Sequence, residues 1–154
     1  NLFNAIIPFL SLFFSSQAMS YYSFAFMFYW MAVLIPNSLS TVLFPKISEL
    51  NGLKEYIHAK NILRKSFKYY LPIAITGIVF TFLLSDWFIA LVKEDFLPSS
   101  FMFKAMVSLG FIFGFNVIYA NYLKGLGKVK LYALFTLIQN FILIAISFIL
   151  VSSV

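Results

Sequence analysis

The chain has 154 residues, of which 62% are hydrophobic and only 10% are charged, and its mean hydropathy is +0.96. Soluble domains average about 25% charged residues, so a water-soluble core of this length could not bury so much apolar surface, and lipid must cover much of the chain. The net charge of +6 does not indicate a nucleic-acid partner, because the bases lie in short segments between apolar runs, as in loops that face anionic headgroups.

Residues 1–45 carry no charge. This run is too long for one membrane-spanning helix of about 20 residues and suits two. The polar trio at residues 15–17 would suit an outer turn, so we predict helices over residues 2–15 and 19–44. Because an apolar run starts at Asn1, we expect the chain to be part of a longer protein.

Two prolines are expected to shape the second predicted helix. Pro36 cannot donate to the carbonyl of Ala32, so we expect a kink near mid-membrane. The polar residues that follow could satisfy the freed backbone groups or face a wet cavity; they are Asn37, Ser38, Ser40 and Thr41. Pro45 is expected to end the helix.

Residues 45–68 form a basic stretch with six bases and two acids, a net charge of +4. Such an excess of Lys and Arg indicates a cytoplasmic loop. Helical periodicity over residues 53–68 places five apolar side chains on one face: Leu53, Tyr56, Ile57, Leu63 and Phe67. We therefore predict an amphipathic helix lying at the inner membrane surface, with Lys60 and Arg64 inside its apolar face.

Three further spans are predicted over residues 69–92, 101–123 and 131–151. The loop at residues 93–100 has no basic excess, whereas the loop at residues 124–130 carries +3. Basic and non-basic connections thus alternate as the positive-inside rule requires. The sequence therefore predicts an all-α, polytopic transmembrane helix bundle of about five spanning helices, with one cytoplasmic amphipathic helix.

Four stretches carry a family resemblance: IPNSLSTVLFPKISEL from Ile35, SSQAMSYYSFAFMFYW from Ser15, LVKEDFLPSS from Leu91, and YLKGLGKVKLY from Tyr122 followed by a mid-span Gln139-Asn140. Together they resemble the polysaccharide transporter family, the repeat-unit flippases of the multidrug/oligosaccharidyl-lipid/polysaccharide exporter superfamily. Two positions depart from the family pattern. Ser20-Tyr21 and Glu94 stand where glycines are usual.

The resemblance implies that the chain, residues 1–154, is a single membrane domain from the second lobe of a transporter with two lobes around a central cavity. It implies a multi-pass protein of the bacterial cytoplasmic (inner) membrane. That protein would flip a polyprenyl-diphosphate-linked oligosaccharide, such as an O-antigen or capsule repeat unit, by alternating access. The implied partners are the lipid bilayer, the lipid-linked oligosaccharide and the polysaccharide polymerase machinery. This interpretation as a flippase requires no enzyme activity, cofactor or metal.

Lys60 and Arg64 are candidates for binding the diphosphate, because Arg grips phosphate oxygens in pairs and Lys adds a point charge. Alternatively, both reach lipid phosphates while their stems cover apolar surface. Asp86 lies inside a span and is a candidate for ion coupling. The alternative is an interfacial acid paired with Lys104, since Trp87 next to it is typical of the interface.

Four amides at membrane depth are candidates for binding sugar hydroxyls: Asn37, Asn116, Gln139 and Asn140. Such residues also hydrogen-bond helices together. Gly110 and Gly114 would let another helix approach closely. His58 has no second histidine and no cysteine in the chain, so a metal site is not expected.

Two rival functions stay open. A drug exporter of the same superfamily would favour acids in its cavity, which the single intramembrane Asp86 weakly opposes. A membrane-embedded transferase acting on lipid-linked sugars would need a catalytic acid or histidine pair near a loop, and only Glu94-Asp95 offers one.

Overall fold

The computed structural model describes residues 8, 10–92 and 94–152, and helices dominate them. Four helices are long and apolar enough to cross a membrane: α2 (Ser16–Gly52), α3 (Tyr56–Val92), α4 (Ser100–Gly125) and α5 (Val129–Ser152). A 3-10 helix, η1 (Glu94–Ser99), joins α3 to α4. The predicted all-α membrane bundle is confirmed, and the described ranges contain no strand. Of the helix predicted over residues 2–15, residues 2–7 and 9 lie outside them. Its described part is helical at residues 8, 10 and 11 but not at residues 12–15.

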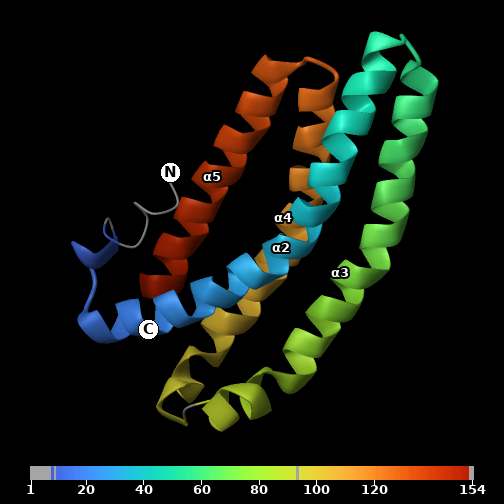
Figure 1. Ribbon diagram of the computed structural model, residues 1–154. Coiled ribbons are helices and arrows are strands. Elements are labelled where there is room, and N and C mark those ends of the chain that lie inside the picture. The colour runs from blue at the N-terminus through green and yellow to red at the C-terminus, as the bar shows by residue number, and fades with distance from the viewer. Residues whose placement is uncertain (1–7, 9, 93, 153–154) are drawn as a thin grey trace.

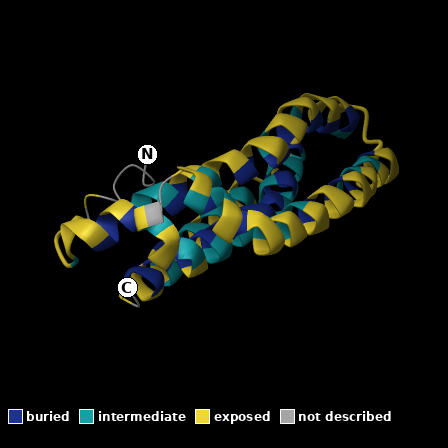
Figure 2. Cartoon of the chain, turned by 90° about the horizontal axis from the view of Figure 1, so that it is seen from below, coloured by how far each residue is buried: buried dark blue, intermediate teal, exposed yellow. Residues whose placement is uncertain are grey.

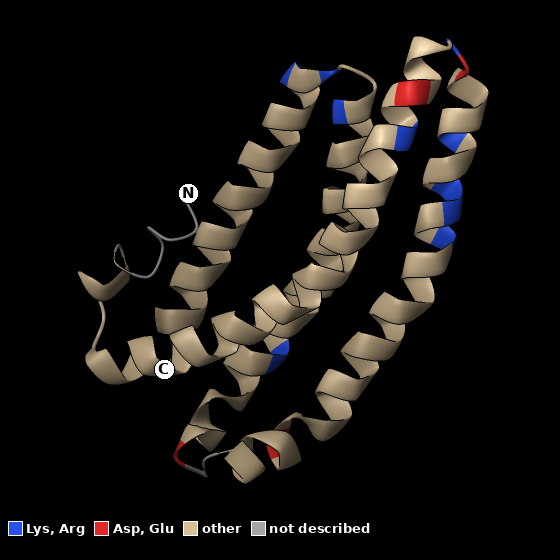
Figure 3. Cartoon of the chain, viewed as in Figure 1, with Lys and Arg blue, Asp and Glu red and all other residues tan. Residues whose placement is uncertain are grey.

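The four long helices run alternately up and down (Figure 1). The connections after Gly52 and after Gly125 lie at one end of the bundle, and η1 lies at the other. Most Lys and Arg residues lie near those two connections (Figure 3). We call this the basic end, defined by Lys54 and Lys128, and the opposite end the η1 end. The positive-inside rule assigns the basic end to the cytoplasm.

Two predicted boundaries are wrong. The helix predicted to stop at Pro45 continues to Gly52, and the separate amphipathic helix over residues 53–68 is instead the start of α3. Pro45 is exposed while Leu43 and Ile47 are buried, so packing holds the helix together although proline removes one backbone bond. Helices α2 and α3 have 37 residues each and are therefore about 55 Å long. A hydrocarbon core is about 30 Å thick, so α2 and α3 continue beyond it as a hairpin.

Other helices leave most of the apolar face predicted for residues 53–68 uncovered. Leu53, Tyr56 and Ile57 are 62%, 57% and 78% exposed, so contact of this face with the membrane surface stays a prediction. The part of α3 that packs against the rest of the bundle here contains Ala59 and Leu63. A small residue such as Ala59 allows close packing at this contact.

The two connections at the basic end share one geometry and one sequence pattern. Residues 50–55 read LNGLKE and residues 123–128 read LKGLGK. In each, the sixth residue's N–H donates to the first residue's carbonyl at 2.9 Å, the bond that closes a Schellman turn. The fifth residue has a positive φ, 60° at Lys54 and 73° at Gly127. Only Gly127 adopts it without steric cost.

Glycines allow α4 to approach α2 closely. A Cβ added at Gly110 would lie 2.8 Å from the Cβ of Ala32 and 2.9 Å from the carbonyl oxygen of Tyr29. One added at Gly114 would lie 2.8 Å from Cγ of Pro36 and would also overlap the Tyr70 ring. The predicted packing role of both glycines is confirmed, and their neighbours are on α2 and α3.

Buried tyrosines tie the other helices to this pair. The fully buried Tyr70 of α3 donates to the carbonyl of Phe111 on α4 at 2.8 Å. Tyr22 of α2, also fully buried, donates to Ser147 on α5 at 2.9 Å. Buried residues are confined to the facing sides of the helices, and exposed residues cover the outward sides (Figure 2). This pattern fits a bundle whose outer surface meets lipid or further helices.

We expect Gly110→Ala to destabilise the protein. The added methyl would press on the α2 backbone at Tyr29, and overpacking of this kind costs about 1–3 kcal/mol. The matched control is Gly52→Ala, because nothing lies within 4 Å of a Cβ added there. Thermal unfolding of the purified protein in detergent should show a lower Tm for Gly110→Ala only. Equal Tm values for the two variants would contradict the packing described.

Candidate functional site

A polar cavity of about 260 Å³ lies between α2, α4 and α5. Helix α2 contributes Tyr29, Trp30, Val33 and Asn37; α4 contributes Val117, Ala120 and Asn121; α5 contributes Tyr132, Thr136, Gln139 and Asn140. We call it the amide cavity, after the four amide side chains in its wall. Its volume is slightly below the roughly 300–1,000 Å³ of sites for drug-sized ligands, so it would hold one part of a large substrate.

Helical spacing brings these side chains together. Residues four apart lie on one face of a helix, and the cavity uses 29, 33 and 37 on α2 and 132, 136 and 140 on α5. Tyr132 and Asn140 follow Lys128 by four and twelve residues. These separations correspond to about 6 and 18 Å along the helix axis. The amide cavity therefore lies in the half of the bundle nearer the basic end.

Hydrogen bonds fix part of the cavity wall. Gln139 accepts a hydrogen bond from the side chain of Asn116, and it also interacts with the buried Tyr29 hydroxyl. Asn121 donates to the Val117 carbonyl at 2.9 Å. The Oδ1 atom of Asn140 is buried and has no hydrogen-bond partner among the described residues. An acceptor left unpaired in this way is costly, and a ligand donor would satisfy it.

The described lining of the cavity is uncharged and rich in amide and aromatic side chains. No charged side chain is found among its described lining residues. Each amide offers both a donor and an acceptor, which matches hydroxyl groups that do the same. The rings of Tyr29, Trp30 and Tyr132 add flat apolar faces with a polar tip. The described part of the chain has no group of three or more His, Cys, Asp or Glu side chains suited to a metal.

Three of the four predicted amides meet at this cavity. Asn37, Gln139 and Asn140 line it, whereas Asn116 contacts it only through its bond to Gln139. Sequence reasoning missed five polar or aromatic lining residues: Tyr29, Trp30, Asn121, Tyr132 and Thr136. A four-residue spacing of polar and aromatic residues in an apolar span, as in Tyr132, Thr136 and Asn140, could have identified the α5 wall.

Lys60 and Arg64 lie elsewhere. Both are exposed on α3 near the basic end, and neither lines the amide cavity. Arg64 lines a separate groove between α2 and α3, whereas Lys60 is not among that groove's described lining residues. The structure therefore does not bring the pair together with the amides, and their binding of a diphosphate stays a prediction.

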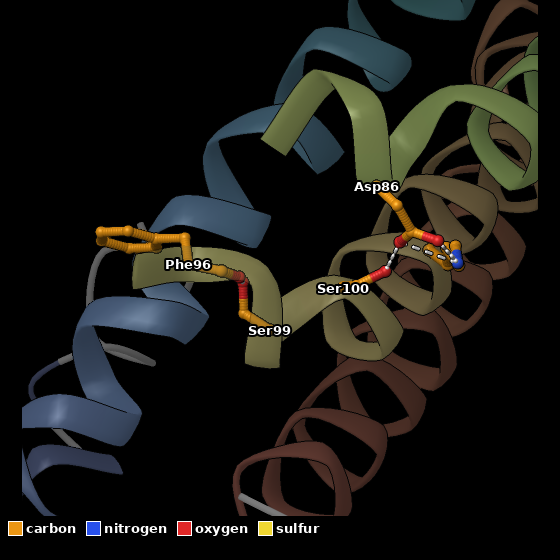
Figure 4. A network of polar contacts seen from close by, with 5 residues as sticks. Asp86, Phe96, Ser99 and Ser100 are labelled. Carbon is orange, nitrogen blue, oxygen red and sulfur yellow. Dashed lines mark hydrogen bonds and ion pairs between the residues drawn. The ribbon is translucent and has the colours of Figure 1, made fainter. Parts of the chain in front are cut away.

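Asp86 is held in a polar contact at the η1 end (Figure 4). Its carboxylate accepts a hydrogen bond from the Ser100 hydroxyl, and the Lys104 ammonium lies 3.1 Å from each of its oxygens. The Asp86 side chain is 63% exposed and that of Lys104 is 21% exposed. Nearby, Ser99 donates to the Phe96 carbonyl at 2.6 Å. The predicted pairing with Lys104 is confirmed, and ion coupling by Asp86 stays a prediction.

The comparison with protein families decides the class of this protein. The family profile described as MatE matches residues 1–149, which is nearly the whole chain. The chain belongs to the MatE family. No curated protein and no solved structure shows significant similarity to it.

MatE family membership, together with four long apolar helices, indicates a multi-pass membrane protein of a multidrug/polysaccharide exporter superfamily. Members of the family are transporters and not enzymes. The transferase alternative therefore loses its support, while the choice between a drug and a lipid-linked sugar as the cargo depends on the cavity.

We expect Asp86→Asn to leave the rate of transport and its pH dependence unchanged. The carboxylate faces Lys104 and Ser100 on the bundle surface and does not line the amide cavity, so its charge serves the junction of α3 and α4. Lys104→Met should have the same small effect, and the double variant should be no worse than either single one. A shifted pH profile for Asp86→Asn alone would instead indicate that this carboxylate couples transport to protons.

Proposed function

We propose that this MatE-family protein moves a polyprenyl-diphosphate-linked oligosaccharide, such as an O-antigen or capsule repeat unit, across the bacterial inner membrane by alternating access. The observation that carries the proposal is the amide cavity, an uncharged pocket of amide and aromatic side chains at membrane depth. Buried amides in hydrocarbon are costly unless they find partners, and sugar hydroxyls are suitable ones.

A cationic drug is matched less well by this chemistry. The rings of Tyr29, Trp30 and Tyr132 could contact a cation, but no carboxylate is found among the described lining residues to neutralise it. The intramembrane acid Asp86 already has a cationic partner in Lys104 and lies outside the amide cavity. The charge distribution of the described helices thus favours a neutral, hydroxyl-rich cargo over a cationic one.

The position of the cavity suits loading from the side where lipid-linked sugars would be built. It lies nearer the basic end, which the positive-inside rule assigns to the cytoplasm. Lys60 and Arg64, exposed on α3 at that end, are our candidates for neutralising the diphosphate as the sugar enters. The contact of Pro36 with Gly114 is a place where α2 could tilt against α4 during the change of access. Released substrate would pass to polysaccharide polymerase machinery outside.

We expect Asn140→Leu to slow flipping at least tenfold. The change removes the unpaired acceptor from the cavity, and a site built to hydrogen-bond hydroxyls discriminates strongly when a partner is lost. The control is Asn51→Leu, which removes an amide at the end of α2, outside the lining of the cavity. The measurement is flipping of a fluorescent lipid-linked oligosaccharide by the complete protein in vesicles.

Cationic dye export by the same vesicles separates the two superfamily functions. The proposal expects flipping without dye export, and loss of flipping in Asn140→Leu but not in Asn51→Leu. Dye export with no flipping would favour a drug exporter. Equal flipping by the two variants would remove the amide cavity from the transport route.

A further inference from the structure

A second hollow, of about 490 Å³, lies between the parts of α2 and α3 near the basic end. Its lining residues are Lys46 and Leu50 of α2 and His58, Asn61, Ile62, Arg64 and Lys65 of α3. We call it the hairpin groove. It shares no lining residue with the amide cavity. Of its lining residues, the proposed transport reaction uses Arg64 alone, as a candidate for neutralising the diphosphate.

The hairpin groove is strongly cationic. Lys46 is paired with Glu49 at 2.9 Å and His58 with Glu55 at 2.8 Å. Neither Arg64 nor Lys65 has an acidic partner in the part of the chain that the structure describes. No carboxylate is found among the groove's described lining residues, and the exposed Lys46–Glu49 pair is weak enough to exchange its partner. An anion entering the groove would therefore meet two unneutralised cations and a third that is easily released.

The depth of the groove matches the headgroup layer. The Lys124 ammonium at the end of α4 lies 5.0 Å from the centre of the Phe44 ring. A Cβ added at Gly125 would lie 2.8 Å from the Cβ of Ile47. Helix α4 thus ends beside the turn that carries Lys46. The loop that joins α4 to α5 lies at this level and is rich in lysine. Such a loop marks the membrane surface, so the groove opens at that surface.

Below the groove, α3 exposes the apolar surface that a lipid needs. Tyr69, one turn beyond Lys65, is 67% exposed, which suits the interfacial position typical of tyrosine. Ile73 and Phe80 follow further along the same helix and are 40% and 58% exposed. A molecule with a phosphate in the groove could lay its acyl chains along these side chains. A soluble anion would make no use of this surface.

We propose that the hairpin groove binds the phosphate of an anionic phospholipid from the surrounding leaflet. The Arg64 guanidinium would hold two phosphate oxygens in its planar fork, and Lys46 and Lys65 would add point charges. The bound lipid would fix the hairpin of α2 and α3 against the membrane surface. This role does not depend on what the protein transports.

The test compares two double variants of the complete protein in detergent. Arg64→Gln with Lys65→Gln removes two groove cations, and Lys128→Gln with Lys130→Gln removes two cations from the other basic connection. Short-chain phosphatidylglycerol is titrated against each variant, with phosphatidylcholine of the same chains and inorganic phosphate as comparison ligands. Because each basic residue near a phosphate contributes several-fold to affinity, we expect the groove variant to lose about tenfold and the control less than twofold.

Equal losses in the two variants would reduce the effect to net charge and overturn the proposal, as would equal binding of phosphatidylcholine or of inorganic phosphate. Displacement of phosphatidylglycerol by a polyprenyl diphosphate at equal concentration would make the groove a substrate site instead. If the groove variant does not fold, photoactivatable phosphatidylglycerol is bound to the unmodified protein. Label within residues 46–80 supports the site, and label elsewhere overturns it.

Discussion

The absence of hydrogen-bonding partners in hydrocarbon governs this structure. Every backbone group inside the bilayer must be paired within the protein, so the chain crosses as helices. Charged residues are excluded for the same reason, and most Lys and Arg residues lie near the basic end (Figure 3). The exception is informative, because Asp86 and Lys104 occur together and neutralise each other. The direction of each helix follows from this distribution of charge.

Within that frame, the contact of α2 with α4 positions the amide cavity. Gly110 and Gly114 bring the backbone of α4 against Tyr29, Ala32 and Pro36. Tyr29 also lines the cavity, together with Asn37, the residue that follows Pro36. Side chains in place of the glycines would move α2 outward and open the wall between it and α4. Close packing on one face of α4 and a polar cavity beside it are thus parts of one arrangement.

Much of the architecture could be predicted from the sequence, because hydropathy and charge act over whole segments. The spans ending near Val92 and Gly125 follow from apolar runs that stop at a charge, and the last span follows from the uncharged run after Lys130. The prediction that the second helix ends at Pro45 is wrong, because packing of the neighbouring residues outweighs the loss of one backbone hydrogen bond. Which side of α3 is buried near Ala59 depends on the helix that packs against it. The periodicity of one segment carries no information about that neighbour.

The candidate site was predictable only in part for a similar reason. Asn37, Gln139 and Asn140 were recognisable because polar residues are rare in apolar spans. Their common cavity, and the part played by Tyr29 and Asn121, depend on how three helices are turned toward each other. Lys60 and Arg64 are four residues apart, yet only Arg64 is found to line the hairpin groove. Spacing along one helix cannot show which residues a second helix covers.

The sidedness of the two basic connections tests this account most directly. The chain contains no cysteine, so Lys54→Cys, Lys128→Cys and Leu97→Cys can each be placed singly in a cysteine-free version of the protein. A membrane-impermeant maleimide is added to intact cells and to permeabilised ones. The account predicts that position 97 is labelled in intact cells and that positions 54 and 128 react only after permeabilisation. Labelling of positions 54 and 128 from opposite sides of the membrane would contradict it.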